Sequence, residues 1–281
     1  MSRPSSAEKR KTFRKLHESG CFVIPNPWNV GTARYLQGLG FKALATTSAG
    51  HAHSQGCADG AQNRDDVLAH FSELAAATDV PLNADFENGF ADHPDGVADN
   101  VTRCIATGVA GLSIEDSPKD SATPLYDLDL SVTRVKAARA AIDRAGGGVV
   151  FTARAENFIR GVPDLDDVIR RLKAYQAAGA DCLYAPGLTK REQIEAVVQA
   201  VAPQPVNFLN GGALGFTVND LAAIGVRRIS VGGSLARVAM HAFVRTATEI
   251  ANDGTFGGFG GLISNAELNK FFAADRKKLL S

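Results

Sequence analysis

Eight short apolar runs, separated by segments in which apolar residues recur with helical spacing, constrain the fold of this chain more than any other feature. The runs are Cys21–Ile24, Ala43–Thr46, Pro81–Ala84, Gly111–Ile114, Val149–Thr152, Cys182–Ala185, Val206–Leu209 and Arg228–Val231. Short, nearly continuous apolar runs are typical of strands in a parallel sheet that helices cover on both faces. Eight strand–helix units predict a closed (β/α)8 TIM-type barrel rather than an open doubly wound sheet.

Glycines mark the ends of several predicted helices. Gly40, Gly108, Gly179 and Gly225 each stand a few residues before a predicted strand, in the position where a left-handed residue closes a helix. No Gly-x-Gly-x-x-Gly follows the first strand, which further disfavours the open sheet.

The ends of the chain are predicted to be helical. We expect an N-terminal helix over Ser5–Ser19 and a last helix over Asn265–Leu279, joined to the barrel through a flexible connection at Gly254–Gly261. No linker suggests a second domain, so residues 1–281 are predicted to form a single barrel domain with these added helices.

Composition excludes some classes of partner. Thirty basic and thirty acidic residues cancel, so there is no electrostatic case for nucleic acid or for an anionic membrane. No run is long and apolar enough for a signal peptide or a membrane span. Four scattered cysteines without a Cys-x-x-Cys motif are typical of reduced thiols. We therefore expect a cytoplasmic protein.

Charged residues stand at the C-terminal ends of the predicted strands, where such a barrel places its active site. Asp85 and Glu87 follow the third run, Glu115 follows the fourth and Arg154 follows the fifth. Neighbouring carboxylates repel unless a cation or a proton lies between them, and oxygen ligands favour a hard ion such as Mg²⁺. Solvated surface acids are the alternative, but they would not explain charges at the ends of apolar strands. The pattern predicts a metal ion beside an anionic substrate.

Several motifs together resemble the isocitrate lyase/phosphoenolpyruvate mutase superfamily. They are Asn26-Pro27-Trp28-Asn29, Thr47-Ser48-Ala49-Gly50, Asn83-Ala84-Asp85-Phe86-Glu87-Asn88-Gly89, Ile114-Glu115-Asp116 and Ala153-Arg154-Ala155-Glu156. The resemblance extends from about Lys11 to the last helix. It implies a (β/α)8 barrel, usually a homotetramer built as a dimer of dimers, in which the eighth helix is exchanged between subunits. In this chain we expect the segment Leu262–Leu279 to reach the neighbouring subunit. It also implies Mg²⁺ or Mn²⁺ and a small α-oxo acid that reacts through an enolate.

The resemblance assigns the metal site residue by residue. Asp85 matches the direct metal ligand, and Glu87 and Glu115 match residues that act mainly through metal-bound water. Asp59 matches an acid that supports this water shell, and we predict that it is a catalytic residue.

The substrate site follows in the same way. Arg154 matches the arginine that grips the substrate carboxylate or enolate oxygen, and Ser48, Ala49 and Gly50 match the segment whose amides bind the carboxylate. Asn210, at the end of the seventh run, is predicted to bind substrate. Lys119, in the loop after the fourth run, is predicted to close over the substrate; a solvated charge on a mobile loop is the open alternative.

Two departures from the family bear on the reaction. The string Lys-Lys-Cys-Gly-His, whose cysteine serves the family's lyases, does not occur, and Cys57 stands in a different context. The loop Ser117–Tyr126 lacks the asparagine of the mutases. The leading hypothesis is therefore Mg²⁺-dependent C–C cleavage of the oxaloacetate decarboxylase type. C–P bond chemistry and a non-catalytic metabolite-binding protein are the alternatives, and the roles of Cys57, His51 and His53 stay open.

Overall fold

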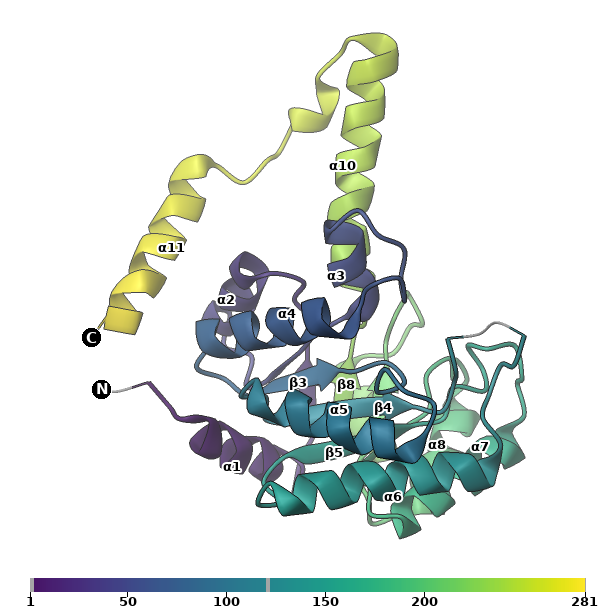
Figure 1. Cartoon of the computed structure of the whole chain (residues 1–281). Helices are drawn as coiled ribbons and strands as arrows, with labels where there is room; N and C mark the ends of the chain where they lie inside the picture. The colour runs from purple at the N-terminus through teal and green to yellow at the C-terminus, as the bar shows by residue number, and fades with distance from the viewer. Residues whose placement is uncertain (1–2, 120–121, 281) are drawn as a thin grey trace.

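A barrel of eight parallel strands lies at the centre of the computed structural model, which describes residues 3–119 and 122–280 (Figure 1). The strands are β1 (Phe22–Ile24), β2 (Leu44–Ala45), β3 (Leu82–Asp85), β4 (Gly111–Glu115), β5 (Val150–Arg154), β6 (Cys182–Tyr184), β7 (Val206–Leu209) and β8 (Arg228–Ser230). Each strand pairs with the next in the order β1-β8-β7-β6-β5-β4-β3-β2. At the remaining seam, the N–H of Ala45 donates to the carbonyl of Pro25 (3.1 Å). The barrel is nearly closed, and all eight predicted strands are confirmed.

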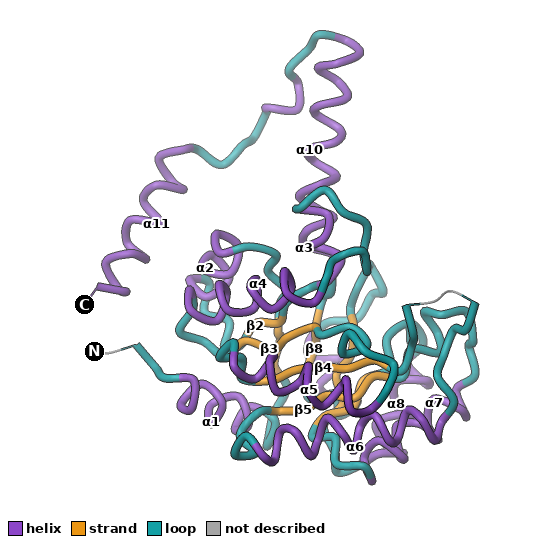
Figure 2. Tube along the Cα trace, viewed as in Figure 1, coloured by secondary structure: helices purple, strands orange, loops and turns teal. Residues whose placement is uncertain are grey.

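Helices alternate with the strands and cover the outside of the barrel (Figure 2). They are α1 (Ser6–Leu16), α2 (Val30–Gly38), α3 (Ser48–Ser54), α4 (Arg64–Ala77), α5 (Pro94–Ala106), α6 (Leu128–Arg144), α7 (Leu165–Ala177), α8 (Arg191–Val201), α9 (Val218–Ile224), α10 (Ser234–Asp253), the 3-10 turn η1 (Gly257–Phe259) and α11 (Asn265–Leu280). None of the helices among the described residues combines the length and the apolarity that a membrane span requires.

Helix boundaries follow the local sequence. The side chains of Asn29, Thr47, Asn63 and Asp127 each accept a hydrogen bond from the backbone N–H three residues further on, which satisfies a donor that the helix start leaves free. The four glycines predicted to end helices all have φ between +89° and +100°, so that prediction is confirmed.

The N-terminal helix is shorter than the predicted Ser5–Ser19. Ser5 caps α1, and its side chain and that of Glu8 form a reciprocal capping box. The helix ends at Leu16, where the buried ring of His17 bonds the carbonyl of Phe13 through Nδ1 (2.8 Å). The chain must then turn into β1, and Gly20, at φ +74°, is part of that turn.

The interior of the barrel is unusually polar. Branched apolar side chains normally fill a barrel of this kind, but here polar side chains line the cavity inside it: Asn26, Asn83, Ser113, Asn207, Arg228 and Ser230. Arg228 donates to Oδ1 of Asn207 (2.8 Å) and Oγ1 of Thr152 (3.0 Å). The apolar core lies instead between the strands and the surrounding helices, around residues such as Leu112 and Phe151.

The C-terminal helices leave the barrel. Figure 1 shows α10 projecting away from the strands and α11 lying near α2. Helix α10 buries none of its residues fully, and Val238 and Phe243 are each 67% exposed. Helix α11 contacts α2 of the same chain, through ring packing of Phe271 on Tyr35 and an ion pair between Asp275 and Arg34. Exchange of a helix between subunits stays a prediction, and α10 presents the larger uncovered apolar face.

The connection between these helices is more ordered than predicted. Residues 254–261 were expected to be flexible, but Glu249 accepts hydrogen bonds from the hydroxyl of Thr255 and from the N–H groups of Gly257 and Gly258. Substitution of Gly258 would bring a Cβ within 2.3 Å of Oγ1 of Thr246. The glycines therefore allow close packing against α10.

A buried histidine pair on α3 and α4 predicts acid sensitivity. The rings of His51 and His70 stack with centroids 3.6 Å apart, and burial together with His51 lowers the pKa of His70 to about 3. In the unfolded chain His70 takes up a proton near pH 6.5, whereas in the folded protein it stays neutral. The contribution of neutral His70 to folding stability is therefore complete above pH 6.5 and is lost as the pH falls toward 3.

As the pH falls from 7 to 5, the parent should lose unfolding free energy. We expect His70→Phe to reduce this loss by up to about 1.4 kcal/mol per pH unit, as measured by urea unfolding at pH 7, 6 and 5. The control Leu74→Val, on the buried face of α4, should lower the free energy by about 1 kcal/mol at every pH. The same pH dependence in His70→Phe and the parent would contradict this prediction.

Candidate active site

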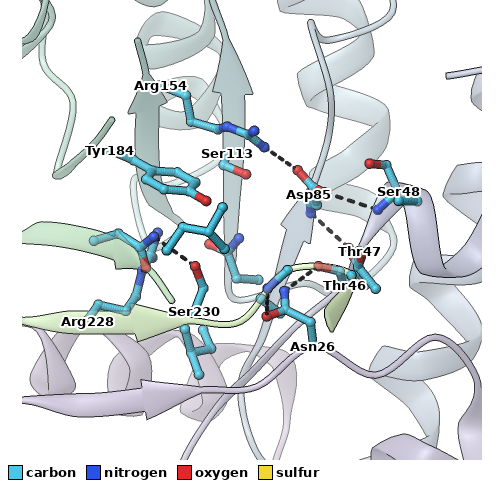
Figure 3. A pocket seen from close by; sticks show the side chains of 18 of the residues that line it. Asn26, Thr46, Thr47, Ser48, Asp85, Ser113, Arg154, Tyr184, Arg228 and Ser230 are labelled. Carbon is cyan, nitrogen blue, oxygen red and sulfur yellow. Dashed lines mark hydrogen bonds and ion pairs between the residues drawn. The ribbon is translucent and has the colours of Figure 1, made fainter. Parts of the chain in front are cut away.

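The polar cavity inside the barrel opens at the C-terminal ends of the strands (Figure 3). It has a volume of about 210 Å³ and is lined by residues from all eight strands. A second cavity adjoins it, since Ser48, Asp59 and Arg154 line both. The described strand ends therefore converge on one region, as predicted.

Asp85 ends β3 and bonds residues that follow β2 and that end β5. Its backbone N–H donates to Oγ1 of Thr46 (2.8 Å), and its Oδ2 accepts from the N–H of Ser48 (3.1 Å) at the start of α3. Its Oδ1 accepts from Nη1 of Arg154 (2.7 Å). Asp85 thus connects the predicted metal site with both elements of the predicted substrate site.

Arg154 is surrounded by three carboxylates. It contacts Asp85 at 2.7 Å, Glu115 at 3.3 Å and Glu156 at 2.8 Å. Burial alone would lower the pKa of the guanidinium, but these charges raise that pKa well above its ordinary value. Arg154 is therefore a permanent buried cation that can donate hydrogen bonds to an anionic ligand.

The other two predicted metal-site carboxylates are also buried beside cations. Burial, followed by the charge of Glu156, raises the pKa of Glu115 to about 8, although Arg154 opposes this shift. Burial raises the pKa of Glu87, while Lys119, 3.0 Å away, opposes it. The site therefore holds more buried negative charge than its own cations fully offset.

Glu87 stands in a strained turn. Its φ is +45°, a conformation that costs a non-glycine residue energy and is retained where the surroundings hold it. The carbonyl of Glu87 accepts from the N–H of Glu115 (2.9 Å). Below the turn, the buried guanidinium of Arg134 donates to the carbonyls of Asn88, Ala91 and Asp92. These bonds keep the Glu87 carboxylate at the mouth of the barrel.

The donor set fits a hard divalent cation held partly by water. No three acid, histidine or cysteine side chains among the described residues form a ready-made metal cage. Mg²⁺, however, keeps several waters and takes only one or two direct carboxylates. The buried carboxylates with raised pKa values are oxygen donors that a cation would stabilise. Their roles as metal residues stay predictions.

The remaining predicted residues separate into two groups. Asp59 and Ala49 line the cavity with Ser48, and Lys119 lines the adjoining cavity. Gly50 and Asn210 line neither cavity. The N–H of Gly50 donates to Oγ1 of Thr47 as part of the helix cap (3.2 Å), so that amide is already used. The backbone N–H of Asn210 donates to the carbonyl of Ser230 (2.9 Å), and its side-chain Oδ1 is buried without a hydrogen-bond partner among the described residues.

Lys119 joins three loops. Its Nζ contacts Glu87 at 3.0 Å and donates to the carbonyls of Gly60 (3.1 Å) and Gln62 (3.5 Å). It also lies 4.3 Å from the ring centroid of Phe90. These contacts favour a closing role over a solvated charge, because they tie the loop after β4 to the segment that carries Asp59.

The three residues whose roles the sequence left undecided lie outside the cavity. His51 packs on His70, His53 lines a separate pocket against α10, and Cys57 is exposed. Neither cavity has a cysteine or a histidine among its described lining residues.

Sequence reasoning missed several residues of the site. Tyr184 and Arg228 line the cavity and Glu156 bonds Arg154. Tyr184 and Arg228 lie in runs that were interpreted as apolar strands, and Glu156 follows a strand but was given no role. A polar residue within an otherwise apolar strand was the available signal for Tyr184 and Arg228.

A buried network fixes Glu156. Oδ1 of Asp116 accepts from the N–H of Glu156 (2.9 Å), and Oδ2 accepts from Arg171 (3.1 Å) and Tyr175 (2.5 Å). The network ties the ends of β4 and β5 to α7, and so fixes the position of the carboxylate that contacts Arg154.

Among known proteins, the chain resembles two groups of curated enzymes. It is 31% identical to the 2-methylisocitrate lyase of Shewanella oneidensis, over 86% of this chain and 85% of that protein. It is 33% identical to the oxaloacetate decarboxylase of Bradyrhizobium sp. (strain ORS 278), over 67% of this chain and 62% of that protein.

Solved structures share the whole fold. A crystal structure from Burkholderia cenocepacia J2315, provisionally described as a lyase/mutase, is 47% identical with a TM-score of 0.91, over 95% of this chain and 96% of that one. A phosphonopyruvate hydrolase in complex with oxalate and Mg²⁺ is 25% identical with a TM-score of 0.83, over 96% of each chain.

The phosphoenolpyruvate phosphomutase family model matches residues 13–251, which include all eight strands and every predicted site residue. Together with the convergence of Asp85, Glu115 and Arg154 at the barrel mouth, this match shows that the chain belongs to the phosphoenolpyruvate phosphomutase family, within the isocitrate lyase/phosphoenolpyruvate mutase superfamily.

Proposed function

We propose that the protein is a Mg²⁺- or Mn²⁺-dependent enzyme that removes CO₂ from a small α-oxo di-acid of the oxaloacetate type. The observation that carries this proposal is the contact of Arg154 with Asp85, which is also bonded to the N–H of Ser48, in a cavity whose described lining residues include no cysteine or histidine. The similarity to oxaloacetate decarboxylases supports the substrate class, and the oxalate–Mg²⁺ complex of a related enzyme supports the cofactor.

The chain's own residues supply most of the chemistry. When the C–C bond β to the oxo group breaks, CO₂ leaves and the electron pair passes to the oxo oxygen as an enolate. Arg154 is placed to donate hydrogen bonds to that oxygen or to the adjacent carboxylate. In a buried site, such a preorganised donor is worth several kcal/mol. The divalent metal, when bound at Asp85 with Glu87 and Glu115, supplies further charge stabilisation.

Decarboxylation asks less of the protein than retro-aldol cleavage. A lyase acting on isocitrate must remove a proton from a hydroxyl and protonate the departing carbon, so it needs two positioned proton-transfer groups. The loop cysteine of the family's lyases is absent, and Cys57 is exposed and outside both cavities. The site therefore favours the simpler reaction.

C–P bond chemistry is the second candidate, favoured by the likeness to phosphonopyruvate hydrolase. The loop after β4 carries no asparagine between Ser117 and Tyr126, whereas the mutases of this family have one there. This difference weighs against mutase activity.

A substrate screen tests both candidates. We expect Mg²⁺-dependent CO₂ release from oxaloacetate or a substituted oxaloacetate, above the metal-catalysed background, and no more than trace cleavage of isocitrate or 2-methylisocitrate. Phosphate release from phosphonopyruvate would favour the second candidate. Efficient cleavage of either isocitrate, lost on mutating Cys57, would overturn the decarboxylase assignment, and no turnover at all would indicate a binding protein.

Removing the central carboxylate tests the site itself. Asp85→Asn should lower kcat/KM by at least about 10²-fold, because an interaction worth several kcal/mol in the transition state is lost. The fold should persist, since Arg154 keeps Glu115 and Glu156 as partners. The control Asp95→Asn, at a fully exposed position, should match the parent. Unchanged turnover of Asp85→Asn at limiting Mg²⁺ would rule out this site.

We also propose that the enzyme is a homotetramer, a dimer of dimers, in which α10 packs on a neighbouring subunit. Helix α10 exposes a face of large apolar side chains that includes Val238 and Phe243. Exposed apolar patches of this kind usually mark a surface that another protein chain covers. Light scattering at micromolar concentration should give four times the chain mass of 29.6 kDa. The double substitution Val238→Asp with Phe243→Asp should reduce it, whereas Leu39→Asp, at an exposed site at the end of α2, should not. A monomeric parent would contradict the proposal.

A further inference from the structure

Tyr184 lines the cavity and has no role in the metal site or the anion site described above. It ends β6 and is only 8% exposed. In the parallel ladder it stands opposite Arg154, and its ring centroid lies 4.9 Å from Cζ of that arginine. Figure 3 shows the hydroxyl pointing into the cavity, toward the side on which Asp85 and Ser48 lie. Ser230, on β8 two strands away, contributes a side-chain hydrogen bond that lowers the pKa of Tyr184.

The proposed reaction needs a proton at carbon, and few groups in the cavity can supply one. Both cavities lack histidine and cysteine among their described lining residues. A guanidinium group does not give up a proton in proteins, which leaves out Arg154 and Arg228, and Lys119 is occupied by Glu87 and two carbonyls. The hydroxyl of Ser113 donates to the carbonyl of Ala84 (3.3 Å). The hydroxyls of Thr46, Thr47, Ser48 and Ser230 also line the cavity, but aliphatic alcohols are weaker acids than a phenol. Tyr184 is therefore the most acidic of the hydroxyl groups that line this cavity.

The surroundings of Tyr184 keep the proton in place until it is needed. Burial raises the pKa of Tyr184 to about 12, the charges of Glu156 and Asp85 add to this shift, and Arg154 opposes it. The phenol is therefore neutral in solution near pH 7. Once the proton has left, the tyrosinate would lie beside the guanidinium of Arg154, which stabilises it.

We propose that Tyr184 is the catalytic proton donor to the enolate carbon. The proposal rests on the proposed decarboxylation. The Oη–H bond of Tyr184 breaks and a C–H bond forms at the carbon that has lost CO₂. The enolate electrons form the new C–H bond and restore the oxo group. A water molecule at the open end of the cavity then returns a proton to Oη, and hydroxide leaves to bulk solvent.

A fixed donor on one wall of the cavity has a stereochemical consequence. The enolate oxygen is held by Arg154, whose guanidinium lies beside the ring of Tyr184, so the planar enolate presents a single face to Tyr184. Protonation by Tyr184 then yields one configuration at a substituted carbon, whereas protonation by bulk water after release yields both in equal amounts.

The test compares the parent with Tyr184→Phe, which keeps the ring beside Arg154 and removes only the hydroxyl. With Mg²⁺ and 3-methyloxaloacetate in D₂O, the parent should give 2-oxobutyrate with one configuration at the deuterated carbon, and the variant should give the racemate. The variant's kcat should fall at least about tenfold, while its Kd for oxalate stays within about twofold of the parent. Tyr35→Phe, on α2 outside the cavity, is the matched control.

A second measurement separates this proposal from the proposed function. The parent with Mg²⁺ should exchange one of the two C3 protons of 2-oxobutyrate with D₂O, and Tyr184→Phe should lose at least about 100-fold in that rate. Selective exchange that depends on Tyr184, without CO₂ release from any di-acid, would overturn only the decarboxylase assignment. CO₂ release with full stereoselectivity in Tyr184→Phe would overturn only the role of Tyr184. A parent that shows neither activity would overturn both.

Discussion

The buried ion cluster around Arg154 is the interaction on which the site depends. One guanidinium contacts Asp85, Glu115 and Glu156, which come from the ends of β3, β4 and β5. Burying four charges is costly unless each is paired and hydrogen-bonded, and here the pairing leaves an excess of negative charge. A divalent cation and an anionic ligand are the partners that such a cluster accommodates together. The same groups that hold the strand ends in place are thus those that the proposed chemistry uses.

The cluster is held by bonds from outside the barrel. Asp116 ties Glu156 to Arg171 and Tyr175 on α7, and Arg134 on α6 holds the turn in which Glu87 adopts φ +45°. The first support comes from α7, which follows β5, and the second comes from α6, which follows β4. Removing either support would displace a carboxylate, and a displacement of about 1 Å is enough to disturb a preorganised site.

Below the cluster, the barrel interior continues the polar character of the site. Arg228 is buried, and its hydrogen bonds among the described residues go to Asn207, Thr152 and His17 rather than to a carboxylate. Burial and Arg228 lower the pKa of His17 to about 3, so this histidine stays neutral and leaves the arginine charge uncompensated. Arg228 places a positive charge inside the barrel, below the carboxylates at the C-terminal ends of the strands. This charge distribution orients an anionic ligand along the barrel axis.

Much of the fold and part of the site could be predicted from the sequence. Strand and helix periods, and glycines such as Gly40 and Gly225, are local signals, so all eight strands were found within a residue or two. Asp85, Glu115 and Arg154 were found because the ends of parallel strands meet at one edge of a barrel. That rule needs only chain order, without any knowledge of side-chain contacts.

Contacts across the barrel were decided by the tertiary structure alone. The pairing of Arg154 with Asp85, 69 residues away, and its contact with the ring of Tyr184 depend on strand register and closure. Local patterns do not record either. The amide of Gly50 was assigned to substrate, but a cap bond to Thr47 uses it. Helix α10 leaves the barrel with its apolar face uncovered, which no local pattern in its sequence indicated. The sequence by itself determined which elements form and where their charges gather; packing in three dimensions decided which of those groups touch, because burial and hydrogen bonding depend on neighbours that are distant in the chain.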